Sequence, residues 1–408
     1  MSNPFVIVGA GLTAAKAVES LRSSGYDGQL VVFGEEHHLP YERPPLSKDY
    51  LLGNAEIDTA FVHTPEWYDE QDVDLRLGAP VTAIDLGSHQ VTAGSDQQAY
   101  DKLLIATGSS PRHLPMADDS GASVAYLRTM EDSRRIKSAF TQGGRIAVIG
   151  GGWIGLEVAS AARNAGSEVT VLETLDLPLL RVLGPEVAEV FAALHRAHGV
   201  DLRLGIEVSA IEETGGRSVV RLGDGSSVEA DLVVVGIGIT PNTALAEAAG
   251  LKTDNGIVVD EHLRTSDPDV FAAGDVASAM HPVLGRAVRV EHWDTAIGQG
   301  ETAGRNMLGK DEAYDRLPYF FTDQYDLGME YVGSIGPDGY DEVVLRGDTT
   351  DTRVFTAFWL RGGKVLAGMH ANDWDAIDPV RAIVGTTVDP ARLRDESVPL
   401  AELAAGLG

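Results

Sequence analysis

The sequence contains no cysteine among its 408 residues. This absence excludes disulfide bonds, thiolate nucleophiles, zinc sites built on cysteine and cysteine-ligated iron–sulfur clusters. Electrons that pass through this chain therefore cannot rest on a protein dithiol.

Long hydrophobic runs are also missing. The longest apolar stretch, residues 146–162, is broken by three consecutive glycines and contains Glu157, so we expect no transmembrane helix. An expected strand at Phe5–Val8 follows Met1 so closely that we expect no signal peptide. Together these features predict a soluble, cytoplasmic protein.

Positive charge is scarce. The sequence has 32 Lys and Arg residues against 61 Asp and Glu residues, which gives a formal net charge of −29. Proteins that bind nucleic acid need a basic surface for the phosphates, so this balance argues against that class. An acidic surface that keeps the protein soluble is the simpler explanation. The length exceeds that of one compact core and predicts two or three domains.

Strands and helices alternate in the N-terminal half, which predicts an α/β fold. A strand at Phe5–Val8, a helix at Thr13–Ser24 and a strand at Gln29–Phe33 form one βαβ unit, and residues 145–172 form a second. Such units build parallel sheets with right-handed crossovers. Further buried strands that end in glycine turns are expected within residues 100–108, 231–238 and 269–275.

The pattern changes after Asp323. Apolar and polar residues alternate over Val343–Arg346, Arg353–Arg361 and Lys364–His370, which predicts an antiparallel meander. Ile377–Val384 has a helical pattern. We expect a separate C-terminal domain with no chemistry of its own visible in the sequence.

A glycine-rich turn joins the first strand to the first helix. Gly9 permits a tight turn, Gly11 lets a pyrophosphate approach the backbone, and Ala14 allows the helix to pack closely on the strand. The helix N-terminus adds amide donors and a partial positive charge. Glu35, after the next strand, is expected to accept a hydrogen bond from a ribose hydroxyl. This arrangement predicts a dinucleotide site.

A second glycine-rich turn, with Gly150, Gly152 and Gly155, occupies the same place in the second βαβ unit. Glu173 closes the next strand, where its carboxylate would pair with a ribose 2′-hydroxyl and repel a 2′-phosphate. No Lys or Arg lies between Glu173 and Arg181, so the sequence favours NAD over NADP. The alternative is a turn that serves packing alone.

Glu157 lies one turn into an otherwise apolar helix, where a carboxylate needs a partner. The candidate partner is Lys48, in a run whose Pro44 and Pro45 prevent a regular helix. We expect a stiff loop that could carry Arg43 and Lys48 against a flat ligand. A surface loop with solvated cations is the alternative.

Two further segments carry candidate ligand contacts. Asp275 ends a strand and could hold a polyol or ribityl chain, although a helix N-cap is the alternative. Glu291, His292 and Trp293 precede a helix expected at Thr295–Leu308, whose N-terminus could face an electron-rich ring. A lone histidine such as His292 is more often structural than an acid–base catalyst.

Together these motifs resemble the FAD-dependent ferredoxin reductases, which include the reductases of aromatic-ring dioxygenases. The resemblance runs from end to end of the chain. It is carried by Gly9–Ala14, Arg43–Lys48, Ala106–Gly108, Gly150–Glu157, Val235–Asn242, Ala273–Asp275 and Glu291–Trp293.

The resemblance implies a fold like that of glutathione reductase, α/β with two Rossmann-type dinucleotide-binding domains and an α+β C-terminal domain. The FAD-binding domain would comprise residues 1–112 and 243–322, the NAD-binding domain residues 113–242 and the C-terminal domain residues 323–408. FAD would take a hydride from NADH and pass single electrons to a ferredoxin or rubredoxin that serves a cytochrome P450 or a ring-hydroxylating dioxygenase.

The predicted site residues follow from these motifs and the resemblance, which also places the Lys48–Glu157 pair beside the flavin and the nicotinamide as the catalytic pair. No metal site is expected. The residues expected to bind FAD or NAD are Gly9, Gly11, Leu12, Thr13, Ala14, Glu35, Arg43, Lys48, Ala83, Ala106, Thr107, Gly108, Arg128, Gly150, Gly152, Trp153, Ile154, Gly155, Glu157, Glu173, Gly236, Ile237, Gly238, Gly274, Asp275, Glu291, His292, Trp293 and Phe321. Thr129 belongs to the same run as Arg128.

Two features depart from the family pattern. Many of these reductases have a Trp-aromatic-Trp-Ser-Asp run near the flavin edge, where this chain has Tyr319–Asp323 with Phe321 in the place of an indole. The acidic total is also unfavourable for an acidic redox partner. A docking patch would have to come from local cations, for which the candidates are Arg286, Arg289, Arg305 and Lys310; ordinary solvated cations are the alternative.

Other functions remain open. Disulfide reductases and cysteine-dependent NADH oxidases share the two dinucleotide sites, but they use a cysteine that this chain lacks. A flavoprotein that senses NADH, like apoptosis-inducing factor, is the alternative from another class.

Overall fold

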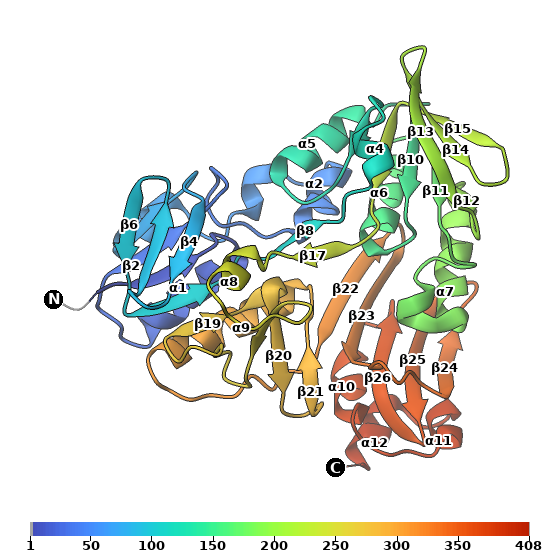
Figure 1. Cartoon of the computed structure of the whole chain (residues 1–408). Coiled ribbons are helices and arrows are strands. Elements are labelled where there is room, and N and C mark those ends of the chain that lie inside the picture. The colour runs from blue at the N-terminus through green and yellow to red at the C-terminus, as the bar shows by residue number, and fades with distance from the viewer. Residues whose placement is uncertain (1–2, 408) are drawn as a thin grey trace. The chain divides into compact units, whose positions relative to one another are not determined.

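The computed structural model describes residues 3–407 and forms two compact units, each containing several segments of the chain (Figure 1). Unit 1 contains the described residues of Met1–Arg43, Asp58–Ser110 and Ile239–Leu317. Unit 2 contains those of Pro44–Ile57, Pro111–Gly238 and Pro318–Gly408. The segment that carries Lys48 therefore belongs to unit 2, although the chain on both sides of it belongs to unit 1. The three-domain division expected from the sequence stays a prediction.

Unit 1 is built on a five-stranded parallel sheet with the strand order β19-β7-β1-β2-β3. The central strands are continuous apolar runs because both faces of the sheet are covered. The predicted strands of the first βαβ unit are confirmed, with small shifts at their ends. The five strands are β1 (Phe5–Val8), β2 (Leu30–Phe33), β3 (Val73–Arg76), β7 (Lys102–Ile105) and β19 (Val270–Ala272).

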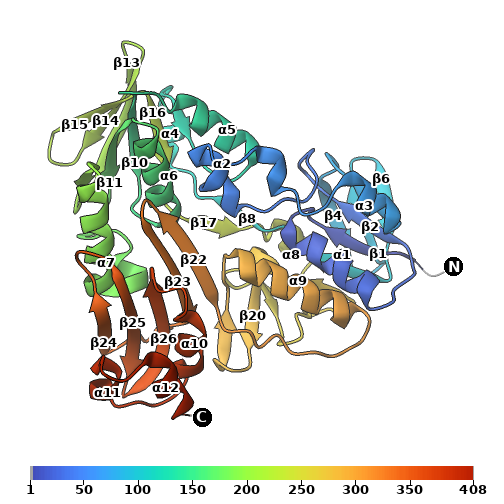
Figure 2. The ribbon, with the colours of Figure 1, turned by 180° about the vertical axis from the view of Figure 1, so that it is seen from behind.

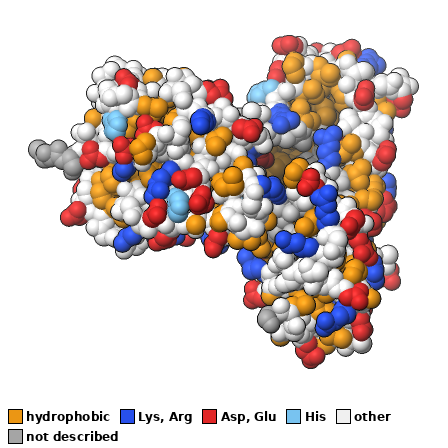
Figure 3. Space-filling model, turned by 60° about the horizontal axis from the view of Figure 1, so that its bottom comes forward, with side chains coloured by type: hydrophobic (Ala, Val, Ile, Leu, Met, Phe, Trp, Pro, Cys, Tyr) orange, Lys and Arg blue, Asp and Glu red, His pale blue; other side chains and the backbone are white. Residues whose placement is uncertain are grey.

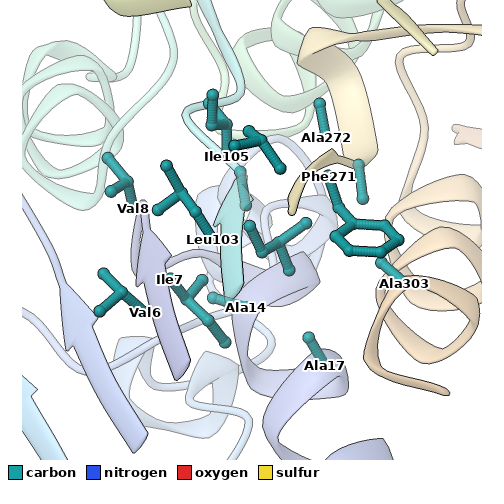
Figure 4. Packing of buried hydrophobic residues seen from close by; sticks show 14 of the residues in the cluster. Val6, Ile7, Val8, Ala14, Ala17, Leu103, Ile105, Phe271, Ala272 and Ala303 are labelled. Carbon is teal, nitrogen blue, oxygen red and sulfur yellow. The ribbon is translucent and has the colours of Figure 1, made fainter. Parts of the chain in front are cut away.

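Two helices of unit 1, α1 (Leu12–Ser23) and α9 (Trp293–Met307), pack closely on one another. A Cβ at Gly300 would lie 2.5 Å from the carbonyl oxygen of Thr13, and one at Gly304 would lie 2.8 Å from that of Ala17. Glycine at these two positions of α9 is therefore what lets the helices approach. Figure 4 shows the small side chains of α1 among those of β1, β7, β19 and α9 in this core.

Smaller elements complete unit 1. Strands β4, β5 and β6 form an antiparallel sheet, and β18, β20 and β21 form a mixed one. Strands β8 and β17 pair as a short two-stranded sheet. The bounds are η2 (Ile57–Ala60), α3 (Pro65–Glu70), β4 (Val81–Asp85), β5 (Gln90–Ala93), β6 (Asp96–Ala99), β8 (Ser109–Pro111), β17 (Ile239–Pro241), α8 (Ala244–Ala248), β18 (Ile257–Val259), η3 (Gly274–Val276), β20 (Ala277–His281) and β21 (Arg286–Val288).

Unit 2 contains a second five-stranded parallel sheet, with the order β12-β11-β10-β16-β9. The second βαβ unit predicted for residues 145–172 is confirmed, with strands at Arg145–Ile149 and Glu168–Leu172. The elements of this part are α4 (Pro115–Asp118), β9 (Val124–Ala125), α5 (Met130–Ala139), β10 (Arg145–Ile149), α6 (Trp153–Asn164), β11 (Glu168–Leu172), α7 (Leu180–Ala197), β12 (Asp201–Arg203), β16 (Leu232–Val235) and the antiparallel strands β13 (Val208–Thr214), β14 (Arg217–Leu222) and β15 (Ser227–Ala230).

The segment with the two prolines is more helical than the sequence suggests. Pro44–Leu46 forms a 3₁₀ turn (η1), and Lys48 is the N-cap of a one-turn helix, α2 (Asp49–Leu52). The prolines occupy the start of the turn, where a backbone N–H has no helical acceptor and is not missed. The hydroxyl of Ser133 donates to the carbonyl of Leu46 at 2.6 Å, which anchors this segment on α5.

The C-terminal part of unit 2 is an antiparallel sheet with the strand order β22-β23-β26-β25-β24, in which β24, β25 and β26 form the predicted meander and the β22–β23 hairpin pairs with β26. Helix α10 packs on β23 and β26 (Figure 2). The bounds are β22 (Tyr319–Gln324), β23 (Leu327–Gly333), β24 (Glu342–Asp348), β25 (Val354–Arg361), β26 (Lys364–Ala371), α10 (Ile377–Ile383), α11 (Pro390–Arg394) and α12 (Leu400–Ala405).

No helix within residues 3–407 has the length and apolar character needed to cross a bilayer.

Candidate functional site

The first glycine turn, in unit 1, has the shape that a phosphate needs. Gly9 has φ +108°, and a Cβ there would lie 2.2 Å from the carbonyl oxygen of Ala106, so no other residue fits. At Gly11 a Cβ would meet no atom within 4 Å. This open space lies at the N-terminus of α1, whose first two residues are Leu12 and Thr13. The amides of a helix N-terminus, with space for a close approach, suit a pyrophosphate.

Other predicted FAD residues of unit 1 lie at the ends of parallel strands. Ala106, Thr107 and Gly108 follow β7, and the Thr107 hydroxyl donates to the carbonyl of Asn242 at 2.9 Å. Glu35 is exposed beyond β2.

Arg43 is held differently from a solvated surface cation. It donates to Glu36 at 3.1 Å, and the hydroxyl of Tyr41 donates to the same carboxylate at 2.6 Å. Ala83 lies apart from these groups in sequence, with its side chain exposed on β4.

Asp275 and Gly274 lie in the 3₁₀ turn η3, after β19. Asp275 is inside this turn and accepts from the hydroxyl of Ser109 at 2.8 Å, so it is not the N-cap considered from the sequence. The amide of Gly274 donates to Gln299 at 2.8 Å. A carboxylate held in this way at a strand end is suited to accept from ligand hydroxyls.

Helix α9 begins at Trp293, two positions before the predicted start at Thr295, because His292 caps it. The Nδ1 atom of His292 accepts from the amide of Asp294 at 3.3 Å. His292 thus has a structural role, while Glu291 accepts from Arg289.

The second glycine turn, in unit 2, repeats the shape of the first. Gly150 has φ +107°, and a Cβ there would lie 2.4 Å from the carbonyl oxygen of Gly236. A Cβ at Gly155 would lie 2.1 Å from the carbonyl oxygen of Gly150, whereas one at Gly152 would meet nothing within 4 Å. Here too the open position lies at the start of a helix, α6. The nearby Trp153, Ile154, Ile237 and Gly238 are partly or fully exposed.

Glu173 is held in place by backbone amides. One of its oxygens accepts from the amide of Gly151 at 2.7 Å, and the other accepts from that of Leu175 at 2.9 Å. The carboxylate is therefore fixed beside the glycine turn, where the ribose of a nucleotide bound at this turn would lie.

The ion pair predicted between Lys48 and Glu157 is present in unit 2, with Nζ and Oε1 2.7 Å apart. Glu157 is 3% exposed and also accepts from the hydroxyls of Ser47, at 2.5 Å, and Thr322, at 2.6 Å. Phe321 contributes its ring, whose centroid lies 5.2 Å from the Lys48 ammonium. The buried carboxylate has three donors, which is how a charge is tolerated inside a protein.

Sequence reasoning missed Ser47 and Thr322. Ser47 adjoins Lys48, so its position offered a weak signal. Thr322 belongs to β22 of the C-terminal sheet, and in this run the sequence pointed only to its neighbour Phe321 as a cofactor contact. Beside it, burial raises the pKa of Asp323, with Lys48 opposing the shift. Asp323 and Lys48 thus share one local electrostatic environment.

Arg128 and Thr129 lie at the start of α5. Thr129 forms a capping box with Asp132, whose carboxylate also accepts from the amide of Arg128 at 3.0 Å. Thr129 therefore has a clear structural function.

The candidate docking cations all lie in unit 1, where ion pairs hold Arg289 and Arg305. Arg289, with its side chain 9% exposed, donates to Glu291, and Arg305 lies 2.5 Å from Glu312. Lys310 is exposed and Arg286 is half-buried. Figure 3 shows Lys and Arg side chains mixed with Asp and Glu side chains over the visible face. The docking role of these residues stays a prediction.

Two known protein families account for most of the chain. The model of the family described as pyridine nucleotide-disulphide oxidoreductase matches residues 3–300. The chain belongs to this family. A second model, described as reductase C-terminal, matches residues 319–404.

Named members of the family resemble the chain over its whole length. The anthranilate 1,2-dioxygenase system ferredoxin–NAD(+) reductase component of Burkholderia cepacia is 42% identical, over 98% of this chain and 98% of that protein. Putidaredoxin reductase of Pseudomonas putida is 40% identical, over 98% and 96%. The solved covalent complex of putidaredoxin reductase with putidaredoxin contains a chain with TM-score 0.94 and 39% identity, over 99% of both chains.

These relationships make the chain an oxidoreductase with FAD and NAD(H) as its cofactors. The geometry fits both cofactors: each glycine turn leaves space at the start of a helix, and Glu173 is oriented by two amides. The fold also agrees with the predicted glutathione-reductase-like class of α/β proteins.

Proposed function

We propose that this protein is an NADH-dependent FAD flavoprotein that reduces a ferredoxin or rubredoxin of an oxygenase system, either a cytochrome P450 or a ring-hydroxylating dioxygenase. The observation that carries the proposal is the 42% identity, across nearly the full length of both chains, with a ferredoxin–NAD(+) reductase component. The site of action is expected to be cytoplasmic.

The cofactors supply the chemistry, in which FAD accepts a hydride from NADH and releases electrons one at a time. The chain supplies binding and orientation. The turn at Gly9–Ala14 would bind FAD, with Arg43, Asp275 and Trp293 as further contacts. The turn at Gly150–Gly155 and Glu173 would bind NAD. Lys48 and Glu157 would place a fixed pair of charges beside the reacting rings.

The alternatives from the sequence receive less support. Water-forming NADH oxidase from Lactobacillus brevis shares the fold, with TM-score 0.86, but is 22% identical. The absence of cysteine excludes a redox cysteine in this chain. A flavoprotein that only senses NADH would not turn over rapidly with an iron–sulfur acceptor.

The direct test is steady-state reduction of a purified [2Fe–2S] ferredoxin by NADH, with cytochrome c as the final acceptor. We expect turnover that depends on both ferredoxin and FAD. Flavin reduction by NADH without ferredoxin-dependent turnover, across ferredoxins and rubredoxins of several oxygenase systems, would favour the sensing function.

The preference for NADH is a separate prediction that rests on Glu173. We expect a much higher kcat/KM for NADH than for NADPH, because a fixed carboxylate repels a 2′-phosphate. Glu173→Ala should bring the kcat/KM values for NADH and NADPH closer together. Glu168→Ala, at the exposed start of β11, the strand that Glu173 follows, is the matched control. Equal values in the unmodified protein would contradict the assignment.

A further inference from the structure

A row of buried polar side chains continues from Glu157 within unit 2. Thr322 and Gln324 alternate along β22 and so share one face of the strand, and His195 faces them from α7. Thr322 Oγ1 lies 2.6 Å from Glu157 Oε1, Gln324 Nε2 lies 3.1 Å from Thr322 Oγ1, and His195 Nε2 lies 2.8 Å from Gln324 Oε1. Thr322 and His195 are 0% exposed, and Gln324 is 1% exposed.

The chemistry of these groups fixes the direction of each hydrogen bond. The carboxylate of Glu157 can only accept, so the one hydroxyl hydrogen of Thr322 points to it. The oxygen of Thr322 then accepts from the amide N–H of Gln324. The amide oxygen of Gln324 must in turn accept from His195, which requires a hydrogen on Nε2.

His195 ends the row, and its burial favours the neutral form of the ring. Burial lowers its pKa to about 4, against a smaller opposite effect of the hydrogen bond to Gln324. Its Nδ1 has no hydrogen-bond partner among residues 3–407, as expected for an Nε2–H tautomer. Every donor in the row points toward Glu157, and such aligned hydrogen bonds strengthen one another.

We propose that Thr322, Gln324 and His195 are positioning residues that hold the carboxylate of Glu157 in the one orientation that aligns the ammonium of Lys48. Oε1 of Glu157 accepts hydrogen bonds from both Thr322 and Lys48. The Thr322 hydroxyl therefore determines the position of the oxygen that pairs with Lys48. Ser47 fixes the other oxygen. The expected effect of these residues on flavin reduction rests on the proposed reduction of FAD by NADH. The direction of the hydrogen bonds from His195 to Glu157 does not depend on that function.

The first test compares Thr322→Val with Thr322→Ser in the FAD-loaded enzyme, by stopped-flow flavin reduction over a range of NADH concentrations. Valine keeps the shape and removes the hydroxyl, while serine keeps the hydroxyl. A hydrogen bond to a charged group predicts a limiting rate on the order of tenfold lower for the valine variant. The Kd for NADH should change less than about twofold, and serine should restore the rate.

A double-mutant cycle separates positioning from a general structural role. If Thr322 acts through the pair, Thr322→Val should have no further effect on the limiting rate in a Lys48→Met background. Equal effects in both backgrounds, or equal rates for the valine and serine variants, would overturn the proposal.

A second test does not need the valine variant to fold. Nitrogen-15 NMR of histidine-labelled enzyme should show a neutral Nε2–H tautomer for His195 at neutral pH, with the signal assigned by His195→Gln. An Nδ1–H tautomer or a charged ring would contradict the proposed direction of the hydrogen bonds. Failure of NADH to reduce the flavin of the unmodified enzyme would reject the proposed function and leave this NMR result to decide the direction of the row.

Discussion

Truncation of Glu157 to alanine should destabilise unit 2 more than any other single change at the ion pair. The carboxylate is 3% exposed, and three donors, from Lys48, Ser47 and Thr322, converge on it. Glu157→Ala leaves these donors without their acceptor. Removing one partner of a buried pair costs about 3–5 kcal/mol. Because the Lys48 side chain keeps 13% exposure, some water can reach it, and we expect the lower end, about 3 kcal/mol.

Truncation of Lys48 should lower the free energy of unfolding less than truncation of Glu157 does. Lys48→Met leaves Glu157 with two hydroxyl donors, so we expect a loss of about 1–2 kcal/mol. Urea unfolding of the FAD-loaded protein, followed by circular dichroism, measures both values. Glu168→Ala is the control, because its side chain is 72% exposed and lies 3.9 Å from Arg145; it should change stability by less than about 0.5 kcal/mol. The reasoning fails if Glu157→Ala costs no more than the control, or less than Lys48→Met.

Two further predictions concern the glycine turn and acid stability. Gly150→Ala should lower both the Tm and NADH binding, since its φ is +107° and its Cβ would lie 2.4 Å from a carbonyl oxygen. Gly152→Ala should leave the Tm unchanged but weaken NADH binding in a fluorescence titration, because its methyl group fills the open space; unchanged affinity would argue against phosphate binding there. For His195, the folded-state pKa of about 4 lies below the ordinary 6.5, so between these values the unfolded chain binds a proton that the folded chain does not. Its contribution to stability should therefore fall by about 1.4 kcal/mol per pH unit as the pH drops from about 6.5 toward 4. Urea unfolding at several pH values should show this slope relative to His195→Gln, and parallel curves for the two proteins would contradict it.

Much of the fold could be predicted because its signals are local. A continuous apolar run such as Phe5–Val8 suits a strand buried on both faces. Gly9 and Gly150 occupy positions of positive φ where a side chain would strike a neighbouring carbonyl. The need of Glu157 for a partner also follows from its place in an apolar helix, and Lys48 proved to be that partner.

Element ends depended on contacts that single residues do not reveal. The helix after Trp293 starts early because a histidine imidazole caps it. The segment from Pro44 forms a 3₁₀ turn rather than an irregular loop, and it belongs to unit 2, where the hydroxyl of Ser133 anchors it.

The sequence by itself determined the two glycine turns and predicts NADH as the preferred nucleotide, because glycine spacing and a carboxylate at a strand end act through local backbone geometry. Only the tertiary structure decided what surrounds the carboxylate of Glu157. Ser47, Thr322, Gln324 and His195 come from a turn, a strand and a helix that are distant in sequence. Residues of these four types are common in ordinary turns, strands and helices, and no sequence spacing identifies them as members of one site. They act together because burial forces every polar group to find a partner, and folding alone determines which partners are within reach.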